Sequence, residues 1–343
     1  MKKLIRIALR NKVAAIRFGL RRFAYKLIQP MLPDGKACLP ETVVFMVTQK
    51  CNLHCQMCYA PRNDGSIKEL TPIECFFVID KIKDVSPILS IGGGEPLSQP
   101  DIIGIISYAK SSGLICNLAT NGTLIDKTMA ERLVAVGLDF ISVSIDSQHL
   151  CGATETELYY SRAVTGMVNL VHARGLNVTP RINVSCHIGL GESLEIPNQL
   201  LRMFNTNHTN KWDTLHFYPI HHHLSTSIKG MDEPSPYGIT MDKFDPKAIQ
   251  EMKMFLQRAS QIKGVYSCCD CESFFSKESS APEKCQLIYR SAMIDAYGDL
   301  FLCRDTLLGN VKDHTIRELW NGEKARAFRQ KRNRTAFVAC SKC

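Results

Sequence analysis

The sequence has 343 residues, of which 45% are apolar, so it can bury the core of one large domain with a smaller appendix. Charged, Gly or Pro residues interrupt every apolar stretch, which excludes a bilayer-spanning run of about 20 apolar residues. The net charge of +9 comes from the N-terminus, because residues 1–28 carry nine basic side chains and no acidic one.

Residues 1–28 alternate their basic side chains with apolar ones, as a cationic amphipathic helix does. Such a helix lies on an anionic membrane surface or packs its apolar face on the rest of the fold, and the sequence leaves both alternatives open. Acid-free, Arg-rich segments also occur in transit peptides and nucleic-acid contacts, whereas the basic residues interrupt any apolar core of a secretory signal. We interpret residues 1–40 as a basic amphipathic segment and linker.

The 15 cysteines are an odd number, which disfavours the fully paired disulfide framework of a secreted protein. Metal ligation in a reducing compartment fits this composition better. We therefore expect a cytoplasmic protein, with the membrane periphery as the alternative location that the N-terminal segment suggests.

Short runs rich in β-branched residues alternate with segments of helical spacing from residue 43 onward. The predicted strands are 43–47, 88–91, 115–119, 140–145, 178–184 and 215–218, and the predicted helices are 72–84, 100–112, 126–136, 160–173, 194–205 and 246–262. This alternation predicts an α/β fold, a partial (β/α)6 TIM-like barrel over residues 41–264 with its active site at the carboxyl ends of the strands. The remaining residues, 265–343, are predicted to form a small cysteine-rich α+β module.

Three cysteines, Cys51, Cys55 and Cys58, lie on one short segment after the first predicted strand. Three thiolates on one loop can ligate three irons of a four-iron cluster and leave the fourth iron open. A structural zinc site normally has four closed ligands, so this loop is a poor match to zinc. The Cys-x3-Cys-x2-Cys loop with the aromatic Tyr59 after it resembles the signature of the radical S-adenosylmethionine (SAM) superfamily.

The resemblance implies a 4Fe-4S cluster on Cys51, Cys55 and Cys58, with SAM bound to the open iron. In that family one electron, supplied by a donor such as flavodoxin or ferredoxin, cleaves SAM to methionine and a 5'-deoxyadenosyl radical. The radical then takes a hydrogen atom from the substrate. Gly93, Gly94 and Glu95 after the second strand match the Gly-Gly-Glu motif of the family, where glycines let a ligand approach and Glu95 can accept from a cationic amine.

Other polar residues at or near strand ends resemble those that line the cofactor pocket in the family. Arg181 and Asn183 share one strand face, so a cation and an amide could meet the cofactor carboxylate and ribose, although a solvent-facing pair is the alternative. The strand-end positions are also ordinary turn residues. The predicted cofactor-binding set is Tyr59, Gly93, Gly94, Glu95, Asn121, Ser144, Asp146, Arg181, Asn183 and Tyr218.

The C-terminal cysteines are similar to the shortened SPASM module called twitch, which binds an auxiliary 4Fe-4S cluster. The matching ligands are Cys285, Cys303, Cys340 and Cys343. Three more cysteines, Cys268, Cys269 and Cys271, could ligate a cluster, donate hydrogen or stay free. A zinc knuckle that includes Cys340 and Cys343 is the structural alternative.

The resemblance implies an oxidoreductase-type radical SAM enzyme, and three substrates compete. Peptide-modifying relatives often carry a separate recognition domain, for which the 40 residues before the barrel are too few. We therefore expect oxidation or epimerisation of a small polar, sugar-like substrate, first as a free molecule and next as a lipid-linked one, and we place peptide or protein maturation after both. A zinc- or RNA-binding protein is the non-enzyme alternative. The Gly-Gly-Glu motif and the three-cysteine loop argue against it, so no nucleic-acid partner is expected.

Overall fold

The structure is a computed structural model of the chain. It describes residues 12–55, 58, 67–146, 153–189, 193–206, 212–220, 245–267, 285–303 and 306–334, without the side chains of 153–157, 219–220 and 334. Within these residues no helix is long and apolar enough to cross a membrane.

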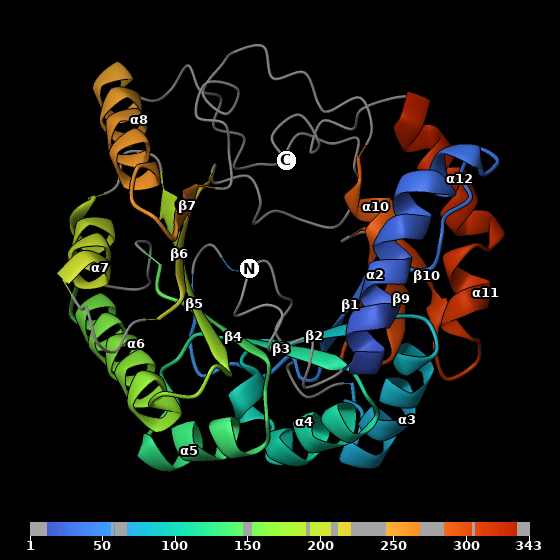
Figure 1. The fold of residues 1–343 in the computed structure, drawn as a ribbon, viewed down its shortest axis with the longest axis horizontal. Coiled ribbons are helices and arrows are strands. Elements are labelled where there is room, and N and C mark those ends of the chain that lie inside the picture. The colour runs from blue at the N-terminus through green and yellow to red at the C-terminus, as the bar shows by residue number, and fades with distance from the viewer. Residues whose placement is uncertain are drawn as a thin grey trace.

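Seven parallel strands form the body of a curved sheet, and helices cover its outer side (Figure 1). The strands are β1 (Thr42–Met46), β2 (Ile88–Gly92), β3 (Ile115–Thr120), β4 (Phe140–Ser144), β5 (Arg181–Gly189), β6 (Thr214–Ile220) and β7 (Val265–Ser267). The helices between them are α3 (Pro72–Lys83), α4 (Ile102–Ser111), α5 (Lys127–Ala135), α6 (Ala153–Arg174), α7 (Glu195–Thr206) and α8 (Pro246–Ser260), and a short 3-10 turn, η2 (Pro96–Ser98), precedes α4. The predicted α/β partial-barrel fold is confirmed.

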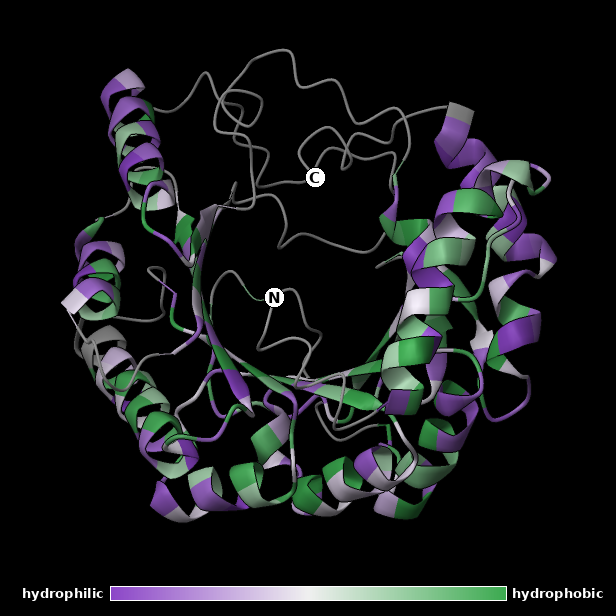
Figure 2. Cartoon of the chain, in the orientation of Figure 1, coloured by the Kyte–Doolittle hydropathy of each residue, from purple (hydrophilic) through white to green (hydrophobic). Residues whose placement is uncertain are grey.

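Alternating side chains give the sheet an apolar outer face and a polar inner face. On β6, Phe217 is fully buried against Phe255 of α8, with ring centroids 4.9 Å apart, so His216 and Tyr218 face inward. Each helix carries both hydrophobic and hydrophilic residues (Figure 2), as amphipathic helices packed on a sheet do. Local signals fix where the helices begin: Thr71 and Glu74 form a capping box at the start of α3.

Three elements differ from the sequence prediction. Strand β5 begins at Arg181 and runs to Gly189, whereas residues 178–184 were predicted. Pro180 has no N–H to give to a strand ladder, so the strand starts after it. Helix α6 begins at Ala153, earlier than the predicted residue 160, and β7 adds a strand that the sequence analysis did not identify.

The C-terminal strands extend the barrel sheet on the other side of β1. The elements are α10 (Leu287–Arg290), β8 (Ser291–Ile294), β9 (Asp299–Phe301), β10 (Leu307–Asn310), α11 (Ile316–Trp320) and α12 (Glu323–Arg334). Strand β8 pairs in parallel with β1, and β9 and β10 follow in antiparallel order, so the sheet runs β10-β9-β8-β1-β2-β3-β4-β5-β6-β7. A tight turn joins β8 to the antiparallel β9, with Gly298 at φ +91°.

The N-terminal segment packs against this C-terminal part. It comprises α2 (Lys12–Leu27), the 3-10 turn η1 (Gln29–Met31) and the linker to β1. Arg329 of α12 is fully buried, and its guanidinium donates to the carbonyls of Gly35 (3.2 Å), Ile288 (2.9 Å) and Trp320 (2.8 Å). Burial lowers the pKa of Arg329 to about 10. One side chain thus connects the linker, α10 and α11.

We expect Arg329→Ala to lower the free energy of unfolding by about 2–4 kcal/mol, because three buried carbonyls lose their donor. Arg326→Ala is the matched control, since Arg326 lies on the same helix with an exposed side chain, and should change the value by less than about 0.5 kcal/mol. Denaturant unfolding followed by circular dichroism measures both. Equal stabilities for the two variants would contradict the role of Arg329.

Candidate active site

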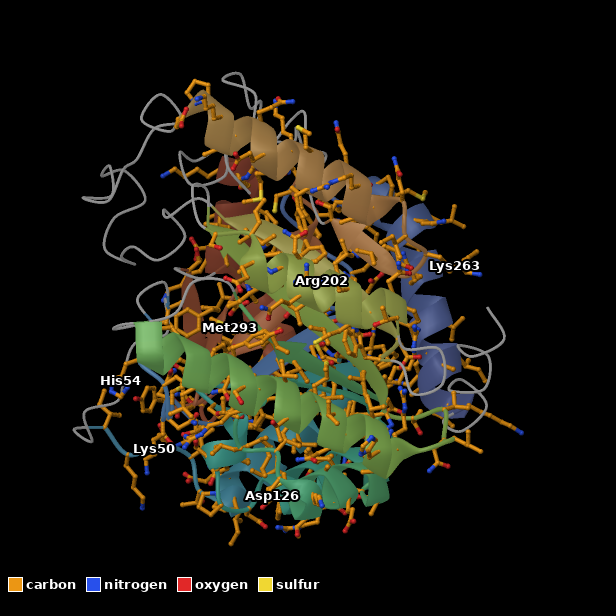
Figure 3. All side chains as sticks on the ribbon, turned by 90° about the vertical axis from the view of Figure 1, so that its left-hand side faces the viewer. Lys50, His54, Asp126, Arg202, Lys263 and Met293 are labelled. Carbon is orange, nitrogen blue, oxygen red and sulfur yellow. The ribbon has the colours of Figure 1, made fainter. Side chains whose placement is uncertain are left out.

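The three-cysteine loop follows β1 at the carboxyl end of the strands. Figure 3 shows Lys50 and His54 of this segment on the side of the molecule opposite Lys263, which lies just before β7. The amino and carboxyl ends of the parallel strands are therefore at opposite sides, with the loop at the carboxyl ends. Cys51, Cys55 and Cys58 lie within the described residues, whereas Tyr59 lies outside them.

Gly93 and Gly94, directly after β2, allow the chain before Cys51 to approach very closely. Gly94 N–H donates to the Thr48 carbonyl (2.8 Å), and Glu95 N–H donates to the Lys50 carbonyl (2.8 Å). A Cβ on Gly93 would lie 2.6 Å from the Thr48 oxygen, and a Cβ on Gly94 would lie 2.5 Å from the Lys50 oxygen. The sequence analysis explained these glycines by ligand approach, but the close neighbour in the structure is the backbone that leads into the cysteine loop.

Glu95 is fully buried and accepts hydrogen bonds from its own chain. Its Oε1 accepts from Leu97 N–H (2.9 Å) and the Thr120 hydroxyl (2.8 Å), and its Oε2 accepts from Asn121 N–H (2.7 Å). Burial raises the pKa of Glu95, although these hydrogen bonds oppose the rise. The carboxylate joins the ends of β2 and β3, and its predicted contact with a cofactor amine stays a prediction.

Side chains that the sequence analysis did not identify also hold the loop. Asn121 Nδ2 donates to Asn52 Oδ1 (2.9 Å), and Asn52 Nδ2 donates to the Thr123 hydroxyl (2.8 Å). On the other side, the Glu69 carboxylate accepts from the Thr48 hydroxyl and from Gln49 N–H, both at 2.8 Å. Asn121 was predicted to bind the cofactor, and the structure brings it to the cysteine loop. No spacing in the sequence marks Asn52 or Glu69.

The thiols have surroundings that fit iron ligation. Burial, with the neighbouring Cys58, Asp146 and Cys51, raises the pKa of Cys55 to about 12, so a free thiol there is neutral and a metal would have to displace its proton. Leu53 N–H donates to Cys51 Sγ at 3.4 Å, a contact typical of cluster sulfurs. Among the described residues no three Cys, His, Asp or Glu side chains surround one metal ion, and a cubane does not require this because each thiolate binds a different iron.

Ser144, Asp146 and His187 form a hydrogen-bonded group beside the loop. The Ser144 hydroxyl donates to Asp146 (2.8 Å), and His187 Nδ1 lies 2.7 Å from Asp146 Oδ1, which also accepts from His187 N–H (2.9 Å). Tyr159 O–H donates to the Ser144 carbonyl (2.6 Å). The structure thus brings two predicted residues together around a histidine that the sequence analysis missed. The alternation of β5 through Ser185 to His187 was the available signal.

Aromatic rings line the inner face of β5, β6 and β7. His187 stacks on Tyr218 with centroids 5.1 Å apart, Tyr218 lies 6.2 Å from His216, and His216 lies 5.0 Å from Tyr266. Burial lowers the pKa of His216, which favours the neutral ring. Tyr218 was predicted to bind the cofactor, and it is the ring of this row that stacks on His187 of the Asp146–His187 pair.

Arg181 and Asn183 lie away from the cysteine loop. Arg181 is the first residue of β5, opposite Phe140 at the start of β4, and its Nε is 3.7 Å from Asp213. Asn183 accepts from the Thr214 hydroxyl (2.7 Å), one layer above Arg181. Arg181 is at the amino end of β5 because the strand begins later than the sequence suggested, and the predicted cofactor contacts of Arg181 and Asn183 stay predictions.

The C-terminal cysteines are partly described. Cys285 precedes α10 and Cys303 follows β9, and both are half-buried against the core. Cys340 and Cys343, together with Cys268, Cys269 and Cys271, lie outside the described residues. Cys75, Cys116 and Cys186 are buried on the outer side of the sheet, where their thiols pack in the core.

We expect Cys303→Ala to remove one of two clusters, so the iron content of reconstituted protein should fall from about eight to about four per chain. Reductive SAM cleavage should persist at the other cluster, while turnover of the true substrate is lost. Iron analysis and chromatography of 5'-deoxyadenosine measure the two effects. A variant that keeps all its iron would remove Cys303 from the ligand set.

The Asp146–His187 pair predicts a pH dependence of stability. Burial by itself lowers the pKa of His187, but the charge and hydrogen bond of Asp146 outweigh burial and raise it above 6.5. The pair therefore stabilises the folded protein fully below pH about 6.5, and this contribution is lost as the pH rises through the raised pKa. In His187→Asn the amide can replace Nδ1 without titrating. The unfolding free energy of the variant should fall less over this range, and parallel profiles would contradict the prediction.

Comparisons with known proteins match two parts of the chain to family models. Residues 45–149, which include the cysteine loop, Gly93–Glu95, Asn121 and Asp146, match the model of the Radical SAM superfamily. Residues 285–343, which include the four C-terminal cysteines, match the SPASM iron-sulfur cluster-binding domain.

Individual relatives cover different shares of the chain. Fe-coproporphyrin III synthase of Methanosarcina barkeri is 38% identical over 38% of this chain, and the match spans only 33% of that protein. AdoMet-dependent heme synthase of the same organism is 25% identical over 86% of this chain and 85% of its own length. Mycofactocin maturase MftC of Mycobacterium ulcerans is 24% identical over 89% of this chain and 80% of its own length.

Solved structures show the same fold at low identity. SuiB of Streptococcus suis, bound to its precursor peptide SuiA, has a TM-score of 0.60 at 16% identity and covers 85% of this chain and 67% of its own. The structure of anSMEcpe with bound AdoMet and the Kp18Cys peptide has a TM-score of 0.59 at 17% identity and covers 89% of this chain and 86% of its own.

Proposed function

The chain belongs to the radical SAM superfamily and carries a SPASM iron-sulfur cluster-binding domain, and on this premise we propose that it removes a hydrogen atom from a peptide substrate. With its 4Fe-4S cluster and SAM bound, the protein has the one-electron chemistry that cleaves SAM to methionine and a 5'-deoxyadenosyl radical. Cys51, Cys55 and Cys58 would each bind one iron. The C-terminal cysteines would hold the auxiliary cluster.

The inner face of the sheet offers contacts that a peptide can use. Its polar side chains form hydrogen-bonded groups, with Asn117 donating to Ser90 (2.9 Å) and Thr214 donating to Asn183 (2.7 Å). The row of rings from His187 to Tyr266 continues this face toward β7, and the described sheet ends at β7 without pairing to β10. A peptide offers amides to the polar groups and side chains to the rings, and an open sheet lets a chain extend beyond the site.

The relatives favour a peptide over the sugar-like substrate expected from the sequence. A polar inner face by itself suits either class. SuiB and anSMEcpe, however, share the fold and have been solved with bound peptides, and a maturase aligns with most of this chain. We therefore place peptide or protein maturation, the second expectation of the sequence analysis, ahead of sugar oxidation or epimerisation.

The Asp146–His187 pair gives the site a proton acceptor for a net oxidation of the substrate. A substrate that loses a hydrogen atom and then an electron must also release a proton. The Asp146 carboxylate fixes the Nδ1 side of His187 at 2.7 Å and leaves Nε2 as the nitrogen that can take the proton. This proton transfer does not involve the residues that hold the cysteine loop in place, which are Asn121, Asn52 and Glu69.

A tetrapyrrole is the second candidate substrate. One relative that aligns with 86% of this chain is a heme synthase. The row of His187, Tyr218, His216 and Tyr266 rings could stack on a flat macrocycle as well as on peptide side chains.

Deuterium transfer distinguishes these substrates. Anaerobically reconstituted protein would be supplied with SAM, reduced flavodoxin as the proposed electron donor, and carbon-deuterated substrate. The probes are a small-peptide fraction from cells grown in deuterated medium and, separately, deuterated iron coproporphyrin III. We expect deuterium in 5'-deoxyadenosine with the peptide fraction. Label transferred only from the porphyrin would overturn the peptide proposal.

A further inference from the structure

Helix α2 is anchored through one face only. Ala14 is fully buried, and the Arg17 guanidinium donates to the carbonyls of Lys83 and Ser86 at the end of α3. Arg21 donates to the carbonyl of Val85 (3.0 Å). These two arginines satisfy carbonyls at a helix C-terminus, so their charges are directed into the protein.

The opposite face of α2 is a continuous apolar band that stays exposed. Its side chains follow one another at intervals of three and four residues, and each is between 55% and 66% exposed: Val13, Ile16, Leu20, Phe23 and Leu27. Ile28 and Met31 continue the band beyond the helix. Scattered apolar residues on a surface are ordinary, but an uninterrupted band of this length marks an interaction surface.

A basic flank accompanies this apolar band. At 100° per residue, Lys12, Arg22 and Lys26 fall on one side of the band, and all three are exposed. Residues 1–28 contain no acidic residue that could neutralise them. The exposed half of α2 therefore presents hydrocarbon bordered by positive charge, which is the pattern of helices that lie in the interface of an anionic bilayer.

A second copy of the chain fits this band less well. The three-four spacing also suits a coiled coil, in which the positions beside the seam carry opposite charges. Here those positions are Lys12, Gly19 and Lys26 on one side and Arg17 and Ala24 on the other. These positions contain no acid that could pair with Lys12 and Lys26 of a second copy, whereas an anionic lipid surface complements both the band and its flank.

We propose that the exposed face of α2 docks the protein on an anionic membrane surface, with the helix axis parallel to the bilayer. The helix, blue in Figures 1 and 3, lies on the side of the molecule opposite Lys50 and His54. Docking through α2 therefore does not require the cysteine loop to contact lipid. The interaction goes beyond the proposed reaction and does not depend on the substrate.

Flotation of the full-length reconstituted protein with vesicles tests this proposal. We expect binding to vesicles of phosphatidylcholine with phosphatidylglycerol, weak binding to phosphatidylcholine alone, and loss of binding as salt is raised. Each basic side chain near the surface contributes about fivefold, so the triple variant Lys12→Gln, Arg22→Gln, Lys26→Gln should bind about a hundredfold more weakly. Leu20→Asp with Phe23→Asp should lower binding at least about tenfold.

Leu176→Asp is the matched control. Leu176 is fully exposed in the loop after α6, so this substitution also replaces an exposed apolar side chain by a carboxylate, but away from α2. SAM cleavage in solution by the α2 variants should equal that of the wild-type protein, which separates lost docking from lost folding or chemistry. Wild-type protein that does not bind anionic vesicles would overturn the proposal. The proposal would also be overturned if sedimentation showed a dimer that Leu20→Asp dissociates, and if the protein did not bind vesicles.

Discussion

Cys55→Ala should lower reductive SAM cleavage at least about a thousandfold, equivalent to ~4 kcal/mol of activation free energy. The physical reason is that the substitution removes one of the three thiolates that would bind the cluster, so only two cysteines of this loop remain as ligands. Cys55 is the middle cysteine of the loop, and in the structure it interacts electrostatically with Cys51, Cys58 and Asp146. The measurement is 5'-deoxyadenosine formed by reconstituted protein under a reductant.

Cys38→Ala is the control for this variant. Cys38 is partly buried in the linker, where its thiol contacts the Ala24 carbonyl (3.7 Å), and it is not part of either predicted cluster. It should leave both iron content and cleavage unchanged. If Cys55→Ala kept wild-type iron and cleavage, the cluster would have to lie elsewhere in the chain.

Gly94→Ala should disrupt the cysteine loop although Gly94 has no side chain that could bind iron. The added Cβ would lie 2.5 Å from the Lys50 oxygen and 2.6 Å from the Gln49 oxygen, distances that real Cβ atoms essentially never show. The two backbones must separate, which breaks the hydrogen bonds from Gly94 N–H to Thr48 and from Glu95 N–H to Lys50. We expect a loss of about 2–4 kcal/mol in unfolding free energy together with poor iron incorporation.

Gly19→Ala provides the comparison for Gly94→Ala. A Cβ at Gly19 in α2 meets nothing within 4 Å, so alanine there should be neutral or stabilising by less than about 1 kcal/mol. Denaturant unfolding and iron analysis of both variants measure the difference. Full iron incorporation by Gly94→Ala would mean that the close approach of residues 48–50 does not position the loop.

Local patterns in the sequence were sufficient for the alternation of the fold and for the cluster motif. The β-branched runs and intervening helical segments predicted six of the strands, and the Cys51 loop and Gly93–Glu95 were recognisable because their function depends on short-range spacing.

Long-range contacts were not predictable in this way. Glu69 and Asn52 contact residues that are 20 to 71 positions away, and no local pattern records such a pairing. The height of a residue on its strand also depends on where the strand begins. Pro180 sets the start of β5, so Arg181 lies at the end opposite the loop and His187, outside the predicted strand, lies beside Asp146.

Electron paramagnetic resonance of the reduced protein tests the central claim most directly. We expect a four-iron cluster signal that changes shape when SAM is added, because the fourth iron, left open by Cys51, Cys55 and Cys58, is available to the cofactor. The change should be absent in Cys55→Ala. A reconstituted wild-type protein without such a signal, or with a signal that SAM leaves unaltered, would contradict the account.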